Sequence, residues 1–234
     1  MPGDPRTRDE LIDAMSQRAC PVCVVVARAE RKAVDHLLYD QVNDISRRDA
    51  LRASRGYCLY HTDMLSEGRS ALGIAIISRD ILRAMTAELE AAGTGQDTSG
   101  SQIFERFVPG TARTGARLAT KIEPQAQCPM CAARPQIEEP LIIGLLRNLD
   151  DDAFAAAFAA SEGLCRRHLA NTLRAANSAT ARQLATLQAA CWRDVEATLD
   201  EFIRKHDYRF NEEVAENERD IWLRALRLSS GWFQ

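Results

Sequence analysis

Cys20-Pro-Val-Cys23 and Cys58-Leu-Tyr-His61 form a pattern of four metal-binding side chains, with 34 residues between its two pairs. The pattern returns as Cys128-Pro-Met-Cys131 and Cys165-Arg-Arg-His168, with 33 residues between the pairs. Together the two copies use six of the seven cysteines and two of the four histidines of this 234-residue chain. Three thiolates and one imidazole are a complete tetrahedral ligand set for zinc. The sequence therefore predicts two closed metal sites, one from each copy.

The spacing within each pair explains how these side chains could meet. Residues three positions apart on a helix point the same way, so each pair of ligands occupies one helical turn. We expect the two pairs of each half to come face to face and to complete a site within that half. Each pair also falls at a predicted helix N-terminus, where unpaired N–H groups and the helix dipole stabilise thiolates.

Zinc at both sites is the first interpretation of these ligand sets. The alternative is an iron–sulfur cluster, because thiolates also select for that chemistry, although clusters are more usually held by four thiolates. A thioredoxin-like redox motif is disfavoured, because no strand pattern precedes Cys20 or Cys128. Haem attachment is not supported, because neither CxxC is followed directly by histidine.

Positions other than the ligands also repeat. Residues 44–61 align with residues 151–168 without a gap and are identical at seven of the 18 positions. An internal duplication is the simplest account of this agreement. The halves diverge at Pro135 and Pro140, which we expect to break or displace the first helix of the second half. Four arginines of the first half also lack basic counterparts in the second half, namely Arg47, Arg48, Arg52 and Arg55.

The composition predicts an all-α protein, since alanine, leucine, arginine and glutamate dominate and β-branched runs are short. We expect helices over residues 8–18, from Pro21 to about Tyr39, from Asp44 to Gly56 and from Cys58 to about Ala92, with the same plan in the second half. Two apolar stripes at helical spacing are expected to pack on each other as a pseudo-symmetric helical bundle. They are Ile74, Ile77, Ile81, Met85 and Leu89, and Leu184, Leu187, Cys191, Val195, Leu199 and Phe202.

The same reading divides the chain into four parts. Residues 1–92 and 128–206 are the two expected metal-binding helical modules, and residues 207–234 form a helical tail. Residues 93–127 are a linker or excursion, because their start is rich in glycine and polar residues. Within the linker, residues 103–108 are expected to form one short packed turn. The tail has acidic residues followed by apolar ones, and we expect it to dock on the bundle rather than form a dimer contact.

The totals exclude several classes of protein. Hydrophobic residues make up 46% of the chain, which is enough for a folded core. The net charge of −3 and the aromatic content of 6% disfavour a strongly basic, base-stacking nucleic-acid surface. The polar N-terminus and the short apolar runs predict a cytoplasmic protein without a signal peptide or membrane span. In that compartment a CxxC pair more often binds metal than forms a structural disulfide.

Other chemically capable residues are given structural interpretations. Cys191 lies on an apolar stripe and is expected to be a packed core thiol, while His36 and His206 are expected to be structural or solvated. A positive patch is formed by the arginines at 47–55 with Arg166 and Arg167. It is interpreted as a solvated face, and a phosphate or nucleic-acid contact is the weaker alternative.

These interpretations leave no candidate catalytic residue. The chain has no glycine-rich phosphate loop, hydrolase elbow or HExxH motif, which favours a non-enzymatic protein without deciding the question. We therefore expect an adaptor or regulatory role, with another protein or a second copy of the chain as partner. The alternative is an iron–sulfur or thiol-based protein for redox chemistry or sulfur handling.

The pattern CPxC…SxGxCxxH, present twice, resembles an uncharacterised family of bacterial proteins known only as a domain of unknown function. The tail is similar to the same family, through Lys205-His-Asp-Tyr-Arg-Phe210 and, after a run of acids, Trp222-Leu-Arg-Ala-Leu226. The resemblance covers the chain apart from residues 93–127. It implies a helical fold and the eight ligand positions given above, and it implies no activity.

Overall fold

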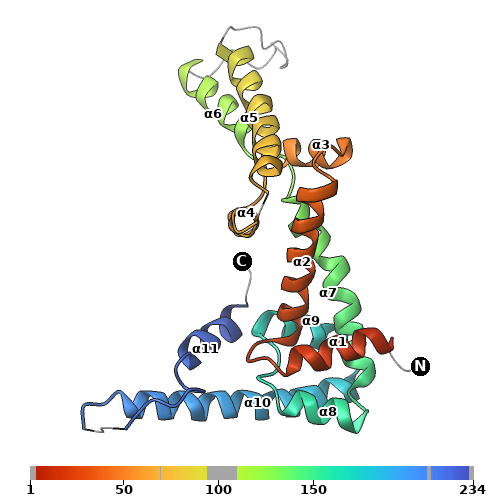
Figure 1. Cartoon of the computed structure of the whole chain (residues 1–234), viewed down its shortest axis with the longest axis vertical. Coiled ribbons are helices and arrows are strands. Elements are labelled where there is room, and N and C mark those ends of the chain that lie inside the picture. Colours follow the sequence, from red (N-terminus) through yellow and green to blue (C-terminus); the bar gives the residue numbers. More distant parts are fainter. Residues whose placement is uncertain (1–3, 69, 94–109, 210–211, 232–234) are drawn as a thin grey trace. The chain divides into compact units, whose positions relative to one another are not determined.

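The computed structural model describes residues 4–68, 70–93, 110–209 and 212–231, and every regular element in these ranges is a helix (Figure 1). The expected all-α class is therefore confirmed. Eleven helices lie in the described ranges: α1 (Pro5–Met15), α2 (Pro21–Asp40), α3 (Ile45–Ala53), α4 (Leu59–Ser66), α5 (Ala71–Gly93), α6 (Gly110–Ile122), α7 (Pro129–Asn148), α8 (Asp152–Ala159), α9 (Arg166–Ala175), α10 (Ser178–Lys205) and α11 (Ile221–Ser230). None of the described helices is both long and apolar enough to cross a bilayer.

The chain divides into two compact units, which differ from the modules expected from the sequence. Unit 1 consists of Met1–Ala29 and Arg134–Gln234, and unit 2 is the single segment Glu30–Ala133. Both boundaries fall inside helices, the first in α2 and the second in α7. Each unit is described separately below.

Capping residues start several helices where the sequence predicts them. Asp44 precedes α3 and accepts a hydrogen bond from the Arg47 N–H at 2.9 Å. Asp151 does the same for α8, accepting from the Phe154 N–H at 2.8 Å. Satisfying one of the free N–H groups in the first turn is what makes such residues good helix starters. The repeated aspartate therefore begins the same short helix in each half.

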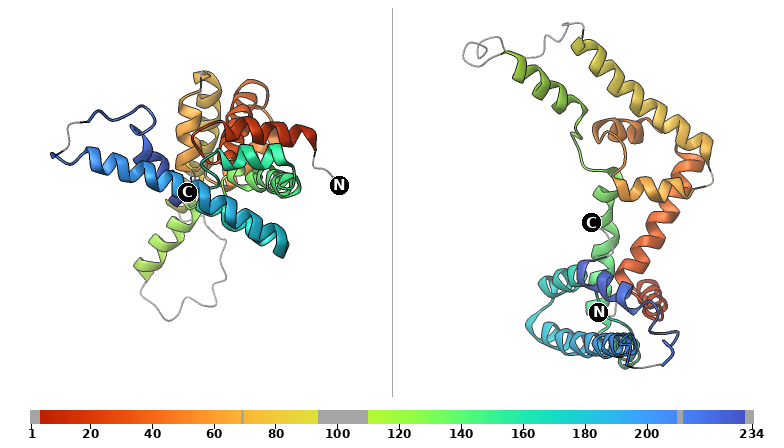
Figure 2. Two further views of the ribbon diagram at one scale, coloured as in Figure 1. Left: turned by 90° about the horizontal axis from the view of Figure 1, so that it is seen from below. Right: turned by 90° about the vertical axis from the view of Figure 1, so that its left-hand side faces the viewer.

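The expected single long helix after Cys58, and its counterpart in the second half, are wrong. The first is two helices, α4 and α5, which run in different directions in the right-hand view of Figure 2. The second is split into α9 and α10, and Asn177 caps the start of α10 by accepting from the N–H groups of Ala179 and Thr180. An asparagine side chain offers the backbone an alternative to a continuing helix, which is why the chain restarts there.

The expected break at Pro135 and Pro140 is also wrong, because α7 runs through both prolines from residue 129 to residue 148. Each proline removes one N–H donor from the helix and crowds the preceding turn. Burial of the residues that follow the prolines offsets that cost, since Leu141 and Leu145 are 4% and 0% exposed. Tertiary packing has overridden the local propensity here.

Unit 1 has its core between α1, α8 and α10. Phe154 and Phe158 of α8 are fully buried, as are Leu11 of α1 and Leu184 of α10. Each such side chain contributes roughly 1.5–3 kcal/mol through burial. The C-terminal helix α11 packs against α9 and α10, so the expected docking of the tail within the chain is confirmed. Trp232, at the end of the tail, lies outside the described residues.

Unit 2 has a separate core formed by α2, α3, α4 and α5. Its buried members are Val34, Leu37, Leu38, Val42, Leu51, Met64, Leu65 and Ile77. Helix α5 packs against α3 and α6, whereas α10 packs against α8 and α11 in unit 1. Each of the two apolar stripes thus packs against helices of its own unit. The sequence had suggested instead that the two stripes pack on each other. The expected packed turn at 103–108 lies outside the described residues.

Candidate metal centres

The structure gathers all eight predicted ligands into two groups, but it pairs them across the two halves of the sequence. Within each group the four ligand atoms lie within 4.8 Å of one another. Site 1, in unit 1, consists of Cys20, Cys23, Cys165 and His168. Site 2, in unit 2, consists of Cys58, His61, Cys128 and Cys131. The expectation that each half completes its own site is therefore wrong.

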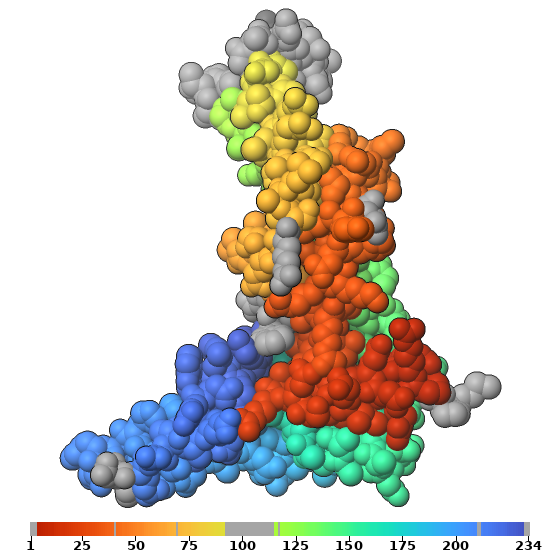
Figure 3. All heavy atoms as spheres, in the orientation of Figure 1, coloured from red at the N-terminus to blue at the C-terminus, as the bar shows by residue number. Residues whose placement is uncertain are grey.

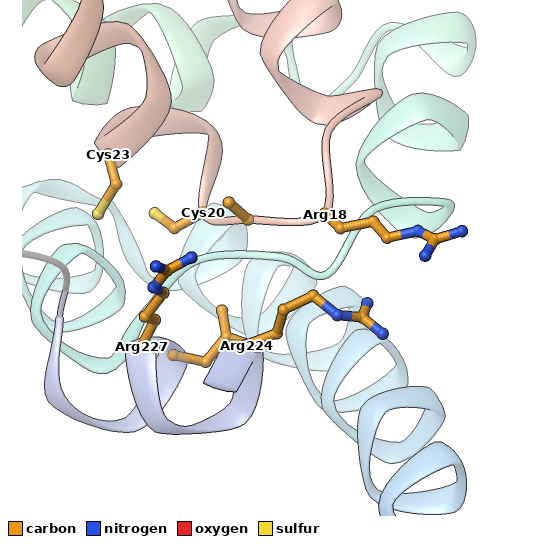
Figure 4. Close-up of a pocket in the computed structure, with 7 residues that line it drawn as sticks. Arg18, Cys20, Cys23, Arg224 and Arg227 are labelled. Atoms are coloured by element: carbon orange, nitrogen blue, oxygen red, sulfur yellow. The ribbon is translucent and has the colours of Figure 1, made fainter. Parts of the chain in front are cut away.

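Each site is formed where two helices begin. Site 1 uses the start of α2 and the start of α9, and site 2 uses the starts of α7 and α4. Pro21 and Pro129 occupy the first helical position after the first cysteine, which suits proline because that position needs no N–H donor. Figure 4 shows Cys20 and Cys23 together at the beginning of α2.

A glycine turn delivers the second pair of ligands to each site. Gly56 has φ +106 and Gly163 has φ +70, a left-handed conformation that glycine adopts without strain. The turn ends at Cys58 or Cys165, which stands at the N-cap of the following helix. Neither cysteine caps its helix through the side chain, so each sulfur atom faces the other ligands.

The distances match a single tetrahedral ion in each site. With Zn–S near 2.3 Å and Zn–N near 2.0–2.1 Å, tetrahedral geometry requires about 3.8 Å between sulfurs and about 3.6 Å between sulfur and nitrogen. In site 1 the Cys23 and Cys165 sulfurs are 3.8 Å apart, and the His168 Nδ1 lies 3.2–3.5 Å from the three sulfurs. Such sulfur–sulfur separations are far too long for a disulfide.

Site 2 has the same geometry. The Cys58 and Cys131 sulfurs are 3.6 Å apart. The His61 Nδ1 lies 3.2–3.5 Å from the sulfurs of Cys58, Cys128 and Cys131. In both sites the donor set and its spacing therefore fit one four-coordinate metal ion held by three sulfurs and the Nδ1 of histidine.

A buried glutamate supports each histidine, and the sequence analysis missed both. Glu138 Oε1 lies 3.3 Å from His168 Nε2, and Glu30 Oε1 lies 3.2 Å from His61 Nε2. A metal-binding histidine usually gives its other ring N–H to such a carboxylate, which fixes the tautomer and the ring orientation. The signal was present in the sequence, because each glutamate stands ten positions after the first cysteine of its CxxC pair.

Each glutamate is carried by the helix that begins at the other site. Helix α2 begins directly after Cys20 and carries Cys23, both ligands of site 1, and it also carries Glu30 of site 2. Helix α7 begins directly after Cys128 and carries Cys131, both ligands of site 2, and it also carries Glu138 of site 1. Each of these helices therefore contributes to both sites.

The charges around each histidine favour a cation. Burial opposes a charged imidazole, but hydrogen bonding to Cys165, Cys23 and Glu138 raises the pKa of His168 to about 11. His61 is raised to a pKa of about 10 in the same way, against burial, by Cys128, Glu30 and Cys58. These shifts reflect the concentration of thiols and carboxylate around each ring. A divalent metal would supply positive charge at the same place and displace the protons.

The two sites differ in exposure and in the groups around them. All four ligands of site 1 are buried, whereas Cys58 and Cys131 of site 2 are only partly buried. In site 1, Arg167 donates to both oxygens of Glu138 at 2.8 and 2.9 Å. The corresponding residue beside site 2 is Tyr60, whose ring meets the edge of the His61 ring. Site 2 is therefore the more accessible of the two.

The C-terminal helix covers site 1. The residues that line a small pocket next to Cys20 and Cys23 include Arg224 and Arg227 of α11, which Figure 4 shows across the pocket from the thiols. Arg224 is buried and ion-paired with Glu162, just before the glycine turn of site 1. The docked tail thus shields this site from solvent.

The remaining cysteine and histidines have the structural roles expected of them. Cys191 is fully buried, and its thiol donates to the Phe158 carbonyl at 3.4 Å. Burial raises the pKa of this thiol to about 11, which keeps it protonated and unreactive. His206 ends α10 and donates from Nδ1 to the Phe202 carbonyl at 2.8 Å. The exposed His36 lies beside Gln41.

The fold and the sites together define an all-α protein with two candidate Cys3His metal centres. The sequence matches the family of unknown function DUF6062 over residues 10–234, and the chain belongs to that family. A similar protein is the uncharacterized 23.9 kDa protein in the xynA 3'region of Caldicellulosiruptor sp. (strain Rt8B.4). It is 25% identical over 226 residues, which cover 94% of this chain and 99% of that protein. No solved structure matches the chain. The expected membership of a family of unknown function is confirmed.

Proposed function

We propose that this chain is a zinc protein in which two structural Cys3His sites hold the helices together, and that its surface serves an adaptor or regulatory role toward a protein partner. The carrying observation is that each site brings three sulfurs and one nitrogen to tetrahedral spacing, all within 4.8 Å. Structural zinc sites fill all four positions with protein ligands, whereas catalytic ones keep one open. Both sites here have the closed pattern.

The same distances support one ion over an iron–sulfur cluster, the alternative metal group. A cluster places iron and sulfide atoms between the thiolates, so its ligand sulfurs stand farther apart than those around a single ion. Histidine in the set also favours zinc, because clusters are more usually held by four thiolates. Burial of all four ligands of site 1 argues further against thiol exchange, which needs accessible sulfur.

Two surface features support a protein partner over nucleic acid. Arg52 is ion-paired with Asp80 at 2.8 Å, and Arg48 donates to the Val42 carbonyl at 2.9 Å. These two arginines therefore already bind partners within unit 2, which leaves them less free to contact phosphate groups. Leu59 and Leu72 of unit 2 are 78% and 74% exposed, as apolar side chains of a protein contact would be. We place the protein in the cytoplasm, where thiol ligands stay reduced.

Elemental analysis of protein purified without oxygen tests the zinc assignment. We expect about two zinc ions per chain and no colour, one ion for each closed ligand set. Removing the metal with a chelator should unfold the chain, because structural zinc contributes on the order of 10 kcal/mol per site. If the analysis finds iron with acid-labile sulfide, the sites hold an iron–sulfur cluster and the zinc assignment is wrong. If the metal-free chain has an unchanged melting temperature, the proposed structural role of the metal is refuted.

A further inference from the structure

A cavity of about 350 Å³ lies between α4 and α5 in unit 2. Buried or half-buried apolar side chains line it, namely Leu65, Ile74, Ile77 and Ile81. Exposed hydroxyl groups surround them, from Thr62, Ser66 and Ser78. Arg55, Gly56 and Tyr57 form the wall at the turn that leads to Cys58. An apolar cavity with a few polar groups is the usual form of a small-molecule site, and this volume lies at the lower end of that class.

The corresponding place in unit 1 is filled. Residues 107 positions apart correspond in the two halves, so Leu164 matches Tyr57 and Gln188 matches Ile81. Gln188 is 2% exposed and its Oε1 accepts a hydrogen bond from the Leu164 N–H at 2.7 Å. Its Nε2 donates to the Leu164 carbonyl at 3.3 Å. A side-chain amide therefore satisfies the backbone just before Cys165.

Unit 2 lacks this amide. Ile81 has no hydrogen-bonding group, and no described residue accepts a hydrogen bond from the Tyr57 N–H. Leu164 is fully buried, whereas Tyr57 is only partly buried at the cavity wall. In unit 1 the Leu164 N–H is bonded to the side-chain oxygen of Gln188, whereas in unit 2 the corresponding Tyr57 N–H is left as a donor.

A cation stands next to this donor. Arg55 donates to the carbonyls of Arg52 and Lys121, and among the described residues it meets no carboxylate. Its Nε is buried without a hydrogen-bond partner. The backbone of Arg55 has φ +54 because this residue follows the end of α3, where the Gly56 N–H donates to the Leu51 carbonyl and the Arg55 N–H to the Arg52 carbonyl. At the corresponding position unit 1 has Glu162, whose charge is neutralised by Arg224.

We propose that this cavity binds a small amphiphilic carboxylate. One carboxylate oxygen takes the place that Gln188 Oε1 occupies in unit 1 and accepts from the Tyr57 N–H. The charge of the carboxylate is balanced by Arg55, and the apolar body of the ligand lies against Ile74, Ile77 and Ile81. This site does not depend on which metal occupies site 2, so it stands apart from the zinc assignment.

Titration of the full-length protein with octanoate, followed by NMR of the backbone amides, tests the proposal. We expect the Tyr57 and Ile81 amides to shift with saturation, while that of Leu164 stays in place. Octanamide is the matched neutral probe, because it keeps the carbonyl oxygen and loses the charge. It should bind more weakly than octanoate by about tenfold, since hydrogen bonds to charged groups are the stronger ones.

Two variants separate the contributions. Arg55→Gln should weaken octanoate binding by about tenfold and leave octanamide binding unchanged. Ile81→Gln installs the amide of unit 1, so it should abolish binding of both probes by occupying the Tyr57 N–H. Ala185→Ser, at an exposed position of unit 1, is the control and should bind as the wild type does.

Several results would overturn the proposal. They are the absence of saturable shifts at Tyr57, equal shifts at Leu164, or an Arg55→Gln protein that binds octanoate as tightly as the wild type. Tighter binding of a peptide with a free C-terminal carboxylate than of octanoate would also overturn it, in favour of a protein ligand. If Ile81→Gln does not fold, the Arg55→Gln comparison still decides, because that change keeps the stem of the side chain as far as Cδ and removes the charge.

Discussion

The crossed pairing of ligands can be tested by counting metal ions in double variants. Cys20→Ser with Cys165→Ser removes two ligands from site 1 and leaves site 2 intact. Cys20→Ser with Cys58→Ser removes one ligand from each site. Pairing within each half of the sequence would reverse these two outcomes. The variants therefore separate the two arrangements without any knowledge of the biological role.

The size of the effect follows from the ligand count. Structural zinc binds with about 10–16 kcal/mol, so each of four ligands accounts for about 2.5–4 kcal/mol if they share equally. Losing one ligand then weakens a site by about 10²–10³-fold, at 1.4 kcal/mol per tenfold. The first variant should keep one ion at full affinity and lose the other. The second should keep two sites of reduced affinity and none at full affinity.

A chelator titration with a colorimetric zinc readout measures the number of bound zinc ions and their affinity in one experiment. Cys191→Ser is the control, because that buried thiol belongs to neither site, and it should retain two tightly bound ions. A single full-affinity ion in the Cys20/Cys58 variant, and none in the Cys20/Cys165 variant, would refute the crossed arrangement. The far-ultraviolet circular dichroism of each variant shows whether loss of metal also unfolds the corresponding unit.

Two further predictions concern single residues. Glu138→Gln should weaken zinc binding at site 1 by about 10–100-fold and leave site 2 unchanged, and Glu30→Gln should do the reverse, because each carboxylate orients one histidine. Chelator competition measures both, and equal loss at both sites would contradict the assignment. Gly163→Ala should destabilise the protein by about 1–3 kcal/mol in urea unfolding, since φ is +70 and the new Cβ would collide with Gln188. Gly115→Ala, where the Cβ meets nothing within 4 Å, is its control, and equal stability of the two variants would refute the steric argument.

Much of the local structure follows from the sequence, because its causes are local. Asp44 and Asp151 start short helices by accepting backbone hydrogen bonds within three residues. Pro21 and Pro129 open helices for the same kind of reason. The breaks within the expected long helices were missed, since the pattern of apolar residues continues across Asn177 while the cap interrupts the backbone. The continuous helix through Pro135 was missed because distant packing supports it.

The ligand identities were readable from the sequence, but their pairing was not. Three cysteines and a histidine repeat at nearly the same spacing in each half, and either pairing satisfies that spacing equally well. Glu30 and Glu138 were also in plain view, yet a glutamate ten residues after a cysteine has no meaning until a histidine from elsewhere faces it.

The sequence by itself determined an all-α chain, eight metal ligands of the Cys3His type and the helix starts that carry them. These depend on residue chemistry and on contacts within one or two helical turns. Only the tertiary structure decided that the first CxxC pair meets the second CxxH pair, and the second meets the first. That choice depends on which helices pack together, since Cys23 meets Cys165 across 142 positions of the chain and Cys58 meets Cys131 across 73, and short-range spacing carries no information about it.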